Sequence, residues 1–380
     1  MRALVLVLTL GSSLALAQNC PTRASWPTAQ WPQALVSPTD KAAAIKALED
    51  AFFTLQGADA DRLGLRTEGL VIIKNGNLVY EKYARGFDQT KPHLSWSVAK
   101  SFSSALTGIG VKQGALSLTD SICKYLPEYT GKVCDIRVKD PITFGSGLAW
   151  QEGYENEPYQ TSSVISMLYG VGHRDQLKHI LTHRIAAEPG TQWMYSTGDA
   201  QLASAVAKRA LTAKFGKDAF WTVLFDKLGM SSAVFEEDAL GTPQGGSMVY
   251  ATPRDYAKFG WLFLNDGCWN GERILPEGWV SASTTPSDVF VASAGDGEDT
   301  PSGYSWWLNK PIPAVAHIGR VAKPKPWKDS PDDAYSAIGH WGQYIVVVPS
   351  QDLVIVRTGD DRNADLDINQ LVTLSMEVVK

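Results

Sequence analysis

Ser97 and Lys100 stand three residues apart, in the pattern Ser-x-x-Lys. Side chains at positions i and i+3 lie on the same face of a helix, so the lysine amine can hydrogen-bond the serine hydroxyl and take its proton. That pair is the minimal apparatus of a serine nucleophile that works without histidine. The following residues, 98–111, are largely small or apolar and predict a buried helix that would hold the pair in place.

The same spacing occurs again at Ser121 and Lys124, so the pattern alone proves little. There Pro127 follows within two turns and would stop a helix. Even at Ser97 a plainer interpretation exists, in which the serine caps a helix and the lysine is incidental. Motifs elsewhere in the chain distinguish the two interpretations.

Two further motifs supply polar groups of the right kind. The stretch 188–197 places Tyr195 at the start of a predicted helix, behind a Pro-Gly turn, with Thr197 two residues later. The stretch 339–343, Gly-His-Trp-Gly-Gln, comes immediately before a predicted strand, where a glycine lets a substrate approach the backbone closely. Along the chain the three motifs follow in the order Ser-x-x-Lys (SxxK), Tyr-x-Thr (YxT) and His-x-Gly (HxG). Their spacings suit one cleft at the edge of a sheet.

In these motifs the chain resembles the serine β-lactamase and penicillin-binding-protein superfamily. The branch is the one that holds class C β-lactamases, family VIII-type carboxylesterases and 6-aminohexanoate-dimer hydrolases. The likeness spans about residues 69–357 and includes stretches at 150–154, 245–255, 269–276 and 303–307. It implies an α/β (α+β) fold of the β-lactamase/transpeptidase type: an antiparallel sheet, flanking N- and C-terminal helices, and an inserted all-helical lobe at about 115–250.

Carried over to this chain, the resemblance implies that Ser97 is the acylated nucleophile and Lys100 its proton acceptor. Tyr195 would be the second acid/base, which passes the proton to the leaving group and then activates water. Whether Lys100 or Tyr195 is the true base stays open. The backbone N–H groups of Ser97 and Gln343 would form an oxyanion hole, where fixed donors stabilise charge that develops in the tetrahedral state.

Two departures from the family's motifs bear on the substrate. His340 stands where the third motif usually has lysine, which leaves less positive charge to attract the carboxylate of a penicillin or a D-Ala peptide. Thr197 replaces the customary asparagine, which removes an amide that would bind a substrate amide carbonyl. Both favour a carboxylic ester or a small linear amide as substrate. The alternatives are a β-lactamase or D-Ala-D-Ala carboxypeptidase and, from another class, a catalytically idle binding module.

The other candidate residues have plainer interpretations beside the functional one. Tyr154 matches a tyrosine that lines the cleft in the aminohexanoate branch, or it is a structural aromatic residue. Trp341, next to Gly342 in the third motif, walls the acyl pocket or packs in the core. Glu152 and Asp199 could be mistaken for general bases, but solvated or helix-start carboxylates are commoner, so we do not predict them as bases.

The first 17 residues combine a charged start, a short apolar core and a small-x-small cleavage site. This pattern predicts a signal peptide, followed by one exported hydrolase domain at 18–380 that is periplasmic or secreted. Gln18 and Asn19 are a poor approach to a lipidated cysteine, which argues against a lipoprotein.

Export would place the four cysteines in an oxidising compartment. Cys123 and Cys134 flank a short loop and are expected to form a disulfide. Cys20 and Cys268 would then remain, but the sequence does not establish that they pair. Unpaired cysteines are the alternative.

Composition narrows the classes of partner. The 380-residue chain has a formal net charge of −5 and no basic cluster, which argues against nucleic acid. Beyond the leader, no apolar run approaches the ~18 residues of a membrane span. His179 and His183 have the spacing of two zinc ligands, but Ile180 occupies the place of the HExxH glutamate. We therefore predict a small ester or amide as partner, with no metal and no cofactor; the oligomeric state is not predicted.

Turn signals and periodicity predict the elements that position these motifs. Asn75-Gly76, between two apolar runs, predicts a β-hairpin because both residues tolerate positive φ angles. An amphipathic helix is expected from Asp40 to about Leu55, and both ends of the chain should contribute strands to one sheet. The other predicted helices cover 200–211, 219–228, 253–265 and 368–379, and the other strands 304–307, 345–348 and 353–356.

Overall fold

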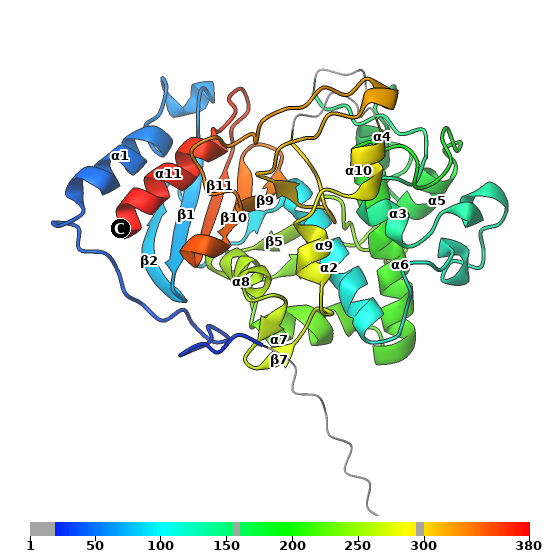
Figure 1. The fold of residues 1–380 in the computed structure, drawn as a ribbon, viewed down its shortest axis with the longest axis horizontal. Coiled ribbons are helices and arrows are strands. Elements are labelled where there is room, and N and C mark those ends of the chain that lie inside the picture. Colours follow the sequence, from blue (N-terminus) through cyan, green and yellow to red (C-terminus); the bar gives the residue numbers. More distant parts are fainter. Residues whose placement is uncertain (1–19, 156–157, 159, 294–299) are drawn as a thin grey trace, which may run out of the picture.

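A computed structural model describes residues 20–155, 158, 160–293 and 300–380. The predicted signal peptide lies outside the described residues. The centre of the fold is a six-stranded antiparallel sheet with the order β2-β1-β11-β10-β9-β8 (Figure 1). Its strands are β1 (Thr67–Lys74), β2 (Asn77–Tyr83), β8 (Trp307–Leu308), β9 (Tyr335–Gly339), β10 (Gln343–Val348) and β11 (Leu353–Gly359).

Strands from both ends of the chain pair at the middle of this sheet, as predicted. β1 lies antiparallel to β11, with Val71 opposite Val356. The β1–β2 hairpin turns at Asn75 and Gly76, whose φ angles of 52° and 77° are those of the expected turn. The mixed α/β architecture with an antiparallel sheet therefore agrees with the predicted fold class.

Helices cover both faces of the sheet because side chains alternate along its strands. Leu70 and Ile72 point into a core formed with α1 (Ala42–Phe52) and α11 (Ile368–Val379), which lie side by side in Figure 1. Val71 belongs to the opposite core. That core includes α2 (Ala99–Lys112) and α8 (Pro253–Leu264).

The remaining helices lie mostly beyond α2, on the side of the molecule away from α1 (Figure 1). Three of them, α4 (Ser163–Tyr169), α5 (Gln176–Leu181) and α6 (Thr197–Phe215), contribute to a third core around Leu148, Met167 and Leu202. Whether residues 115–250 form a separate lobe stays a prediction. These helices are α3 (Lys139–Ile142), α4 (Ser163–Tyr169), α5 (Gln176–Leu181), α6 (Thr197–Phe215), α7 (Asp226–Leu228), α9 (Trp279–Ser283) and α10 (Asp288–Ala292).

Two small sheets complete the fold. One has the order β3-β5-β4, and the other pairs β6 with β7. Their strands are β3 (His93–Leu94), β4 (Val234–Phe235), β5 (Val249–Ala251), β6 (Cys268–Trp269) and β7 (Glu272–Arg273).

Several predicted boundaries are wrong, for local reasons. The first helix ends at Phe52, before the predicted Leu55, because the chain then turns toward a bridge between Gln56 and Leu63. The predicted strand 304–307 is reduced to β8, since Ser305 has a φ of 60° that interrupts an extended run. β9 was not predicted as a strand.

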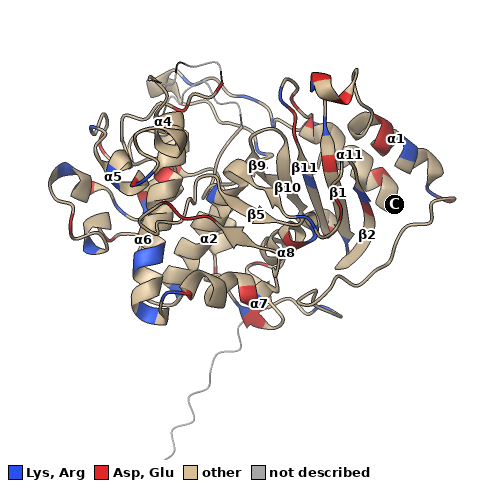
Figure 2. Ribbon diagram, turned by 180° about the vertical axis from the view of Figure 1, so that it is seen from behind, with Lys and Arg blue, Asp and Glu red and all other residues tan. Residues whose placement is uncertain are grey.

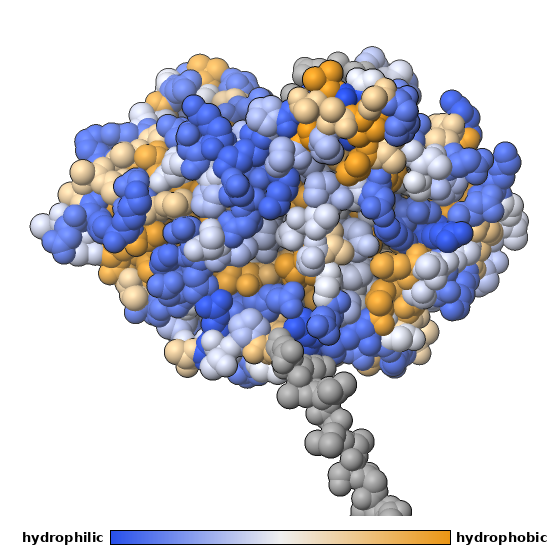
Figure 3. All heavy atoms as spheres, viewed as in Figure 1, coloured by the Kyte–Doolittle hydropathy of each residue, from blue (hydrophilic) through white to orange (hydrophobic). Residues whose placement is uncertain are grey.

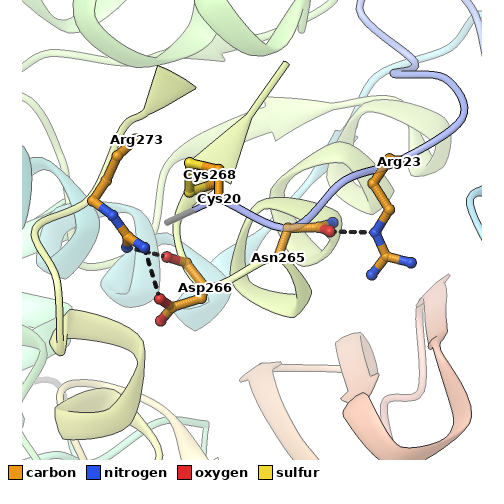
Figure 4. Close-up of a disulfide and its surroundings, with 6 residues drawn as sticks. All are labelled: Cys20, Arg23, Asn265, Asp266, Cys268 and Arg273. Atoms are coloured by element: carbon orange, nitrogen blue, oxygen red, sulfur yellow. Dashed lines mark hydrogen bonds and ion pairs between the residues drawn. A yellow bond between two sulfur atoms is a disulfide. The ribbon is translucent and has the colours of Figure 1, made fainter. Parts of the chain in front are cut away.

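Two disulfides fasten the chain. Cys123 and Cys134, the pair favoured by the sequence, are joined. Cys20 is joined to Cys268, which the sequence alone left open. Figure 4 shows this second bond beside Arg23, which donates to the Asn265 side chain and so ties the N-terminal segment to the loop before β6.

The surface mixes residue types. Lys and Arg are interspersed with Asp and Glu over the ribbon in Figure 2, and hydrophilic and hydrophobic residues are interspersed on the face shown in Figure 3. Within the described part of the chain, the helices are all too short or too polar to cross a membrane.

Candidate active site

Ser97 lies in a single 3₁₀ turn, η2 (Trp96–Val98), that leads directly into α2. This is the predicted helix, with Lys100 in its first turn. The turn is packed closely against the end of β9, because a Cβ added at Gly339 would lie 2.2 Å from the Ser95 carbonyl oxygen. Glycine at 339 therefore lets the edge of the sheet approach the backbone just before Ser97.

The Lys100 amine is held by three acceptors. Its Nζ donates to Ser97 Oγ at 2.8 Å, to Thr197 Oγ1 at 2.9 Å and to the Gly246 carbonyl oxygen at 2.8 Å. The side chain is buried, and burial lowers the pKa of Lys100 to about 8, although the charge on Glu152 acts in the opposite direction. An amine at this pKa is partly neutral near physiological pH.

The partners of Lys100 determine where its lone pair points. The Gly246 carbonyl can only accept, and the Thr197 hydroxyl gives its own proton to Glu152 at 2.5 Å, so it must accept from the amine. When Lys100 is neutral, its two N–H bonds serve these two acceptors. The lone pair then faces Ser97 Oγ, which is the geometry that proton removal from a serine requires.

Glu152 is a shared hydrogen-bond acceptor behind Thr197, and this position was not predicted from the sequence. Its carboxylate accepts from the Thr197 backbone N–H at 2.8 Å and the Thr197 hydroxyl, from Tyr154 Oη at 2.5 Å and from Trp150 Nε1 at 2.6 Å. The Thr197 N–H is the first of α6, so the positive end of a 19-residue helix faces this carboxylate. α6 begins there because Ser196 caps the Asp199 N–H.

A usable signal for Glu152 was present. Trp150, Glu152 and Tyr154 occupy alternate positions, and an extended segment places such positions on one side. By contrast, sequence patterns offer no sign of the Gly246 carbonyl, because a backbone oxygen becomes an acceptor only through tertiary packing. A Cβ at Gly246 would lie 2.8 Å from the Thr197 carbonyl oxygen, so the segment packs directly on the start of α6.

Tyr195 lines the same cavity as Ser97, and its ring centroid is 5.0 Å from Lys100 Nζ. The ring is held between Phe144, at 5.0 Å between centroids, and Trp307, at 5.5 Å. The structure therefore brings Ser97, Lys100 and Tyr195 to one place from three distant parts of the chain.

The third motif forms the turn between β9 and β10. Gly342 has a φ of 89°, and a Cβ there would lie 2.0 Å from Arg357 Nη1, so glycine is required at this position. The buried Arg357 guanidinium donates to the Gly342 carbonyl and forms a two-bond ion pair with Asp361. The Gln343 side-chain amide donates to the carbonyls of His340 and Trp341. These contacts fix the backbone at the start of β10.

Two cavities meet at Ser97. The larger, of about 580 Å³, is lined by residues that include Tyr195, Trp307, Asp361 and Arg362. The smaller, of about 380 Å³, is mostly aromatic and aliphatic and lies against α4. The residues that line both cavities are Ser97, Tyr154, Glu155, His340 and Trp341.

The predicted substrate-binding residues thus surround the nucleophile. The His340 ring stacks on Tyr154 at 4.6 Å between centroids, and its Nε2 lies 2.9 Å from Glu155 Oε1. The Trp341 ring meets Trp96 edge to face at 5.1 Å. The Tyr154 hydroxyl donates its hydrogen bond to Glu152, so Tyr154 can offer a substrate its ring and an acceptor lone pair. Thr197, in contrast, is buried and serves Lys100.

Comparison with known proteins identifies the family of this chain. A family model described as β-lactamase matches residues 50–367, most of the chain. The chain belongs to the β-lactamase family. One relative, the 6-aminohexanoate-dimer hydrolase of Paenarthrobacter ureafaciens, is 22% identical over 323 residues, which cover 77% of this chain and 72% of that protein.

Solved structures of this family share the fold at low identity. A Bacillus anthracis protein assigned as a 6-aminohexanoate-dimer hydrolase superposes with a TM-score of 0.68 at 20% identity, covering 95% of this chain and 90% of the other. A family VIII carboxylesterase gives a TM-score of 0.63 at 14% identity, covering 91% of this chain and 99% of the other.

Three other candidates, Asp199, His179 and His183, have no direct contact with Ser97 or Lys100 among the hydrogen bonds and ring contacts of the described residues. Asp199 is buried and accepts from the Ser146 hydroxyl and N–H, and its burial raises the pKa of its carboxyl to about 7. His183 is bonded to the Ser163 hydroxyl and packs edge to face against His179. Within the described residues, no group of three or more His, Cys, Asp and Glu could hold a metal ion.

Proposed function

We propose that this β-lactamase-family hydrolase cleaves carboxylic esters or small linear amides through an acyl-enzyme on Ser97. The observation that carries the proposal is the arrangement around Lys100. Two fixed acceptors take its N–H bonds and leave the third direction for Ser97 Oγ, 2.8 Å away. A serine hydroxyl is a weak nucleophile unless a neighbouring base takes its proton, and this site holds such a base.

In the acylation step, Ser97 Oγ attacks the substrate carbonyl carbon and its proton passes to Lys100 Nζ. The backbone N–H groups of Ser97 and Gln343 bind the resulting oxyanion. Tyr195 gives a proton to the leaving alcohol or amine and receives a proton from Lys100 Nζ in return. In deacylation the same groups take a proton from water, whose oxygen attacks the acyl carbon. The bond between that carbon and Ser97 Oγ then breaks, and the proton passes to Ser97 Oγ, which restores the hydroxyl.

Within this scheme Glu152 is a positioning residue. It touches no reacting atom, but it orients the Thr197 hydroxyl so that this group accepts from Lys100. Its negative charge also raises the pKa of Lys100 against the effect of burial.

The names of the relatives support an ester or amide as substrate. One relative is named a 6-aminohexanoate-dimer hydrolase, and one solved structure is of a family VIII carboxylesterase. The third motif points the same way, because His340 pairs with Glu155 and so offers less fixed positive charge to a β-lactam carboxylate. Nitrocefin turnover well above p-nitrophenyl butyrate turnover would instead support the β-lactamase alternative.

We propose further that the protein is exported through the leader at residues 1–17. Its two disulfides fit an oxidising compartment. Mass spectrometry of the N-terminal peptide of the protein from the native host should give Gln18, or the pyroglutamate formed from it, as the first residue. An N-terminus at Met1 in the active protein would contradict export.

The direct test removes the nucleophile and compares it with a matched serine. Ser97→Ala should lower kcat/KM for p-nitrophenyl butyrate by at least about 10³-fold. Ser121→Ala removes the serine of the second Ser-x-x-Lys motif, whose hydroxyl donates to the Cys134 carbonyl oxygen, and should leave turnover unchanged. Retained hydrolysis in folded Ser97→Ala would exclude the proposed mechanism and revive the idle binding module.

A further inference from the structure

The two cavities at Ser97 differ in chemistry, and this difference bears on the substrate. Six of the ten residues that line the smaller cavity are aromatic or aliphatic. They are Trp96, Tyr154, Ile165, Leu168, Tyr169 and Trp341. The larger cavity is lined by three carboxylates, Glu155, Asp361 and Asp365, against one guanidinium, Arg362.

The charge imbalance of the larger cavity persists when the ion pairs behind it are counted. Arg357 pairs with Asp361, and Asp360 pairs with both Arg362 and Arg62, so two positive partners and one negative partner are added. One negative charge remains in excess, and we assign it to Asp365, because Glu155 already contacts the His340 ring. A second negative group in this space would be repelled, whereas a cationic group would be attracted.

The position of Tyr195 decides which part of the substrate enters which cavity. This step rests on the proposed function, in which Tyr195 protonates the leaving group. Tyr195 lines the larger cavity and is not among the residues that line the smaller one. A proton donor must lie within hydrogen-bond reach of the atom that it protonates, so the leaving group has to occupy the larger cavity. The acyl chain is then left with the smaller cavity, which also opens at Ser97.

We infer that the preferred substrate joins an uncharged, apolar acyl chain to a neutral or cationic alcohol or amine. The apolar cavity of about 380 Å³ accommodates an aliphatic or aromatic acyl group of several carbons. A leaving group that carries a carboxylate is disfavoured by the acidic cavity. An acyl chain that ends in an ammonium is disfavoured as well, because its only carboxylate neighbour among the lining residues is Glu155, which already contacts His340. The 6-aminohexanoate linear dimer has both features and should be a poor substrate.

The acyl half is tested with p-nitrophenyl esters that share one leaving group. From acetate to hexanoate, kcat/KM should rise by roughly fourfold per methylene until the cavity is full. Leu168→Trp and, independently, Ile165→Trp fill the cavity and should lower the hexanoate-to-acetate ratio at least about tenfold. Val171→Trp adds the same ring at an exposed position outside the cavity and should keep the wild-type ratio.

The leaving-group half is tested with three hexanoate esters of similar size. Their alcohols are choline, which is cationic, its neutral isostere 3,3-dimethylbutanol, and an anionic hydroxypivalate. We expect kcat/KM to be at least about tenfold higher for the choline ester than for the anionic ester, with a ratio that shrinks as salt is added. Asp365→Lys should lower this ratio, and Asp50→Lys, on the distant helix α1, should not.

The outcomes separate this inference from the proposed function. If Ser97 is required but acyl length has no effect, or the anionic ester is preferred, the cavity assignment is wrong while the acyl-enzyme stands. If Leu168→Trp impairs long-chain alkyl acetates instead of long-chain acyl esters, the two cavities are reversed and the inference fails. Hydrolysis of these esters by Ser97→Ala would overturn both.

Discussion

The chain contains two Ser-x-x-Lys motifs, and they lie in opposite environments. Lys100 is buried, contacts three oxygen acceptors, and has its pKa lowered to about 8. Lys124 is exposed and pairs with Asp120 at 2.8 Å, and this hydrogen bond raises the pKa of Lys124. The spacing of the two motifs is identical. What differs is burial and the choice of partners, and these decide whether a lysine can act as a base.

The serines differ in the same way. Ser97 opens onto two cavities, and its hydroxyl is paired with the Lys100 amine. Ser121 caps a short 3₁₀ turn through the Cys123 N–H and donates its own proton to the Cys134 carbonyl oxygen. Its hydroxyl is used structurally, beside the loop that the Cys123–Cys134 disulfide closes.

The largest effect expected after removal of Ser97 comes from the lysines. Lys100→Met keeps an unbranched side chain only one atom shorter but removes the base, so kcat/KM for p-nitrophenyl butyrate should fall by about 10²- to 10⁴-fold. Lys124→Met removes only an exposed charge and should change turnover by less than twofold. Comparable losses in both variants, with both folded by circular dichroism, would remove the distinction between the motifs.

A smaller effect, on stability, is expected from the disulfide beside Ser121. The double variant Cys123→Ser/Cys134→Ser opens a loop with a sequence separation of 11 residues, which should lower the free energy of unfolding by about 2–3 kcal/mol. Urea titration measures this change. Ester turnover per folded molecule should remain at the wild-type level. A parallel loss of turnover below the unfolding transition would show that the two regions are coupled.

The carboxylates behind the two lysines give the finest distinction. The charge on Glu152 raises the pKa of Lys100, so Glu152→Gln should lower that pKa further. More neutral amine is then present at a given pH. The acidic limb of the kcat/KM profile, expected near pH 8 in the wild type, should move to lower pH, while kcat falls about tenfold because Thr197 is less well oriented.

Asp120→Asn is the matched control, since Asp120 is the carboxylate that pairs with Lys124. This variant should leave both the acidic limb of the kcat/KM profile and kcat unchanged. If Glu152→Gln lowered kcat without any shift of the limb, Glu152 would be a structural residue that does not influence the proton transfer.

Local signals in the sequence predicted the parts of the fold that depend on few neighbours. Asn75-Gly76 specified the β1–β2 hairpin, and the final helix begins at Ile368 and ends at Val379, as predicted. β9 escaped notice because Ser336 and Ala337 are buried within a fully paired sheet, where the period-2 pattern of a half-exposed strand is absent. The predicted helix at 219–228 contains a π-helical stretch, Trp221–Phe225, which periodicity does not distinguish.

At the site, the residues within motifs were predicted, whereas the residues that support them were not, although the alternate positions of Trp150, Glu152 and Tyr154 held a signal. Ser97, Lys100 and Tyr195 were named from ordered motifs, and the structure brings them together. Carboxylates such as Glu152 usually face solvent or lie at the start of the helix that contains them. Glu152 instead accepts a hydrogen bond from the start of α6, 45 residues away in sequence. Such long-range partners are set by packing, which residue spacing does not encode.

In this mechanism the chemistry resides at Ser97 and not at Ser121. Treatment of the wild-type protein with a fluorophosphonate, followed by peptide mapping, distinguishes the two serines. A single adduct on Ser97, formed faster as pH rises through about 8, is the result expected from the lowered pKa of Lys100. An adduct on Ser121, or no adduct on folded protein, would contradict it.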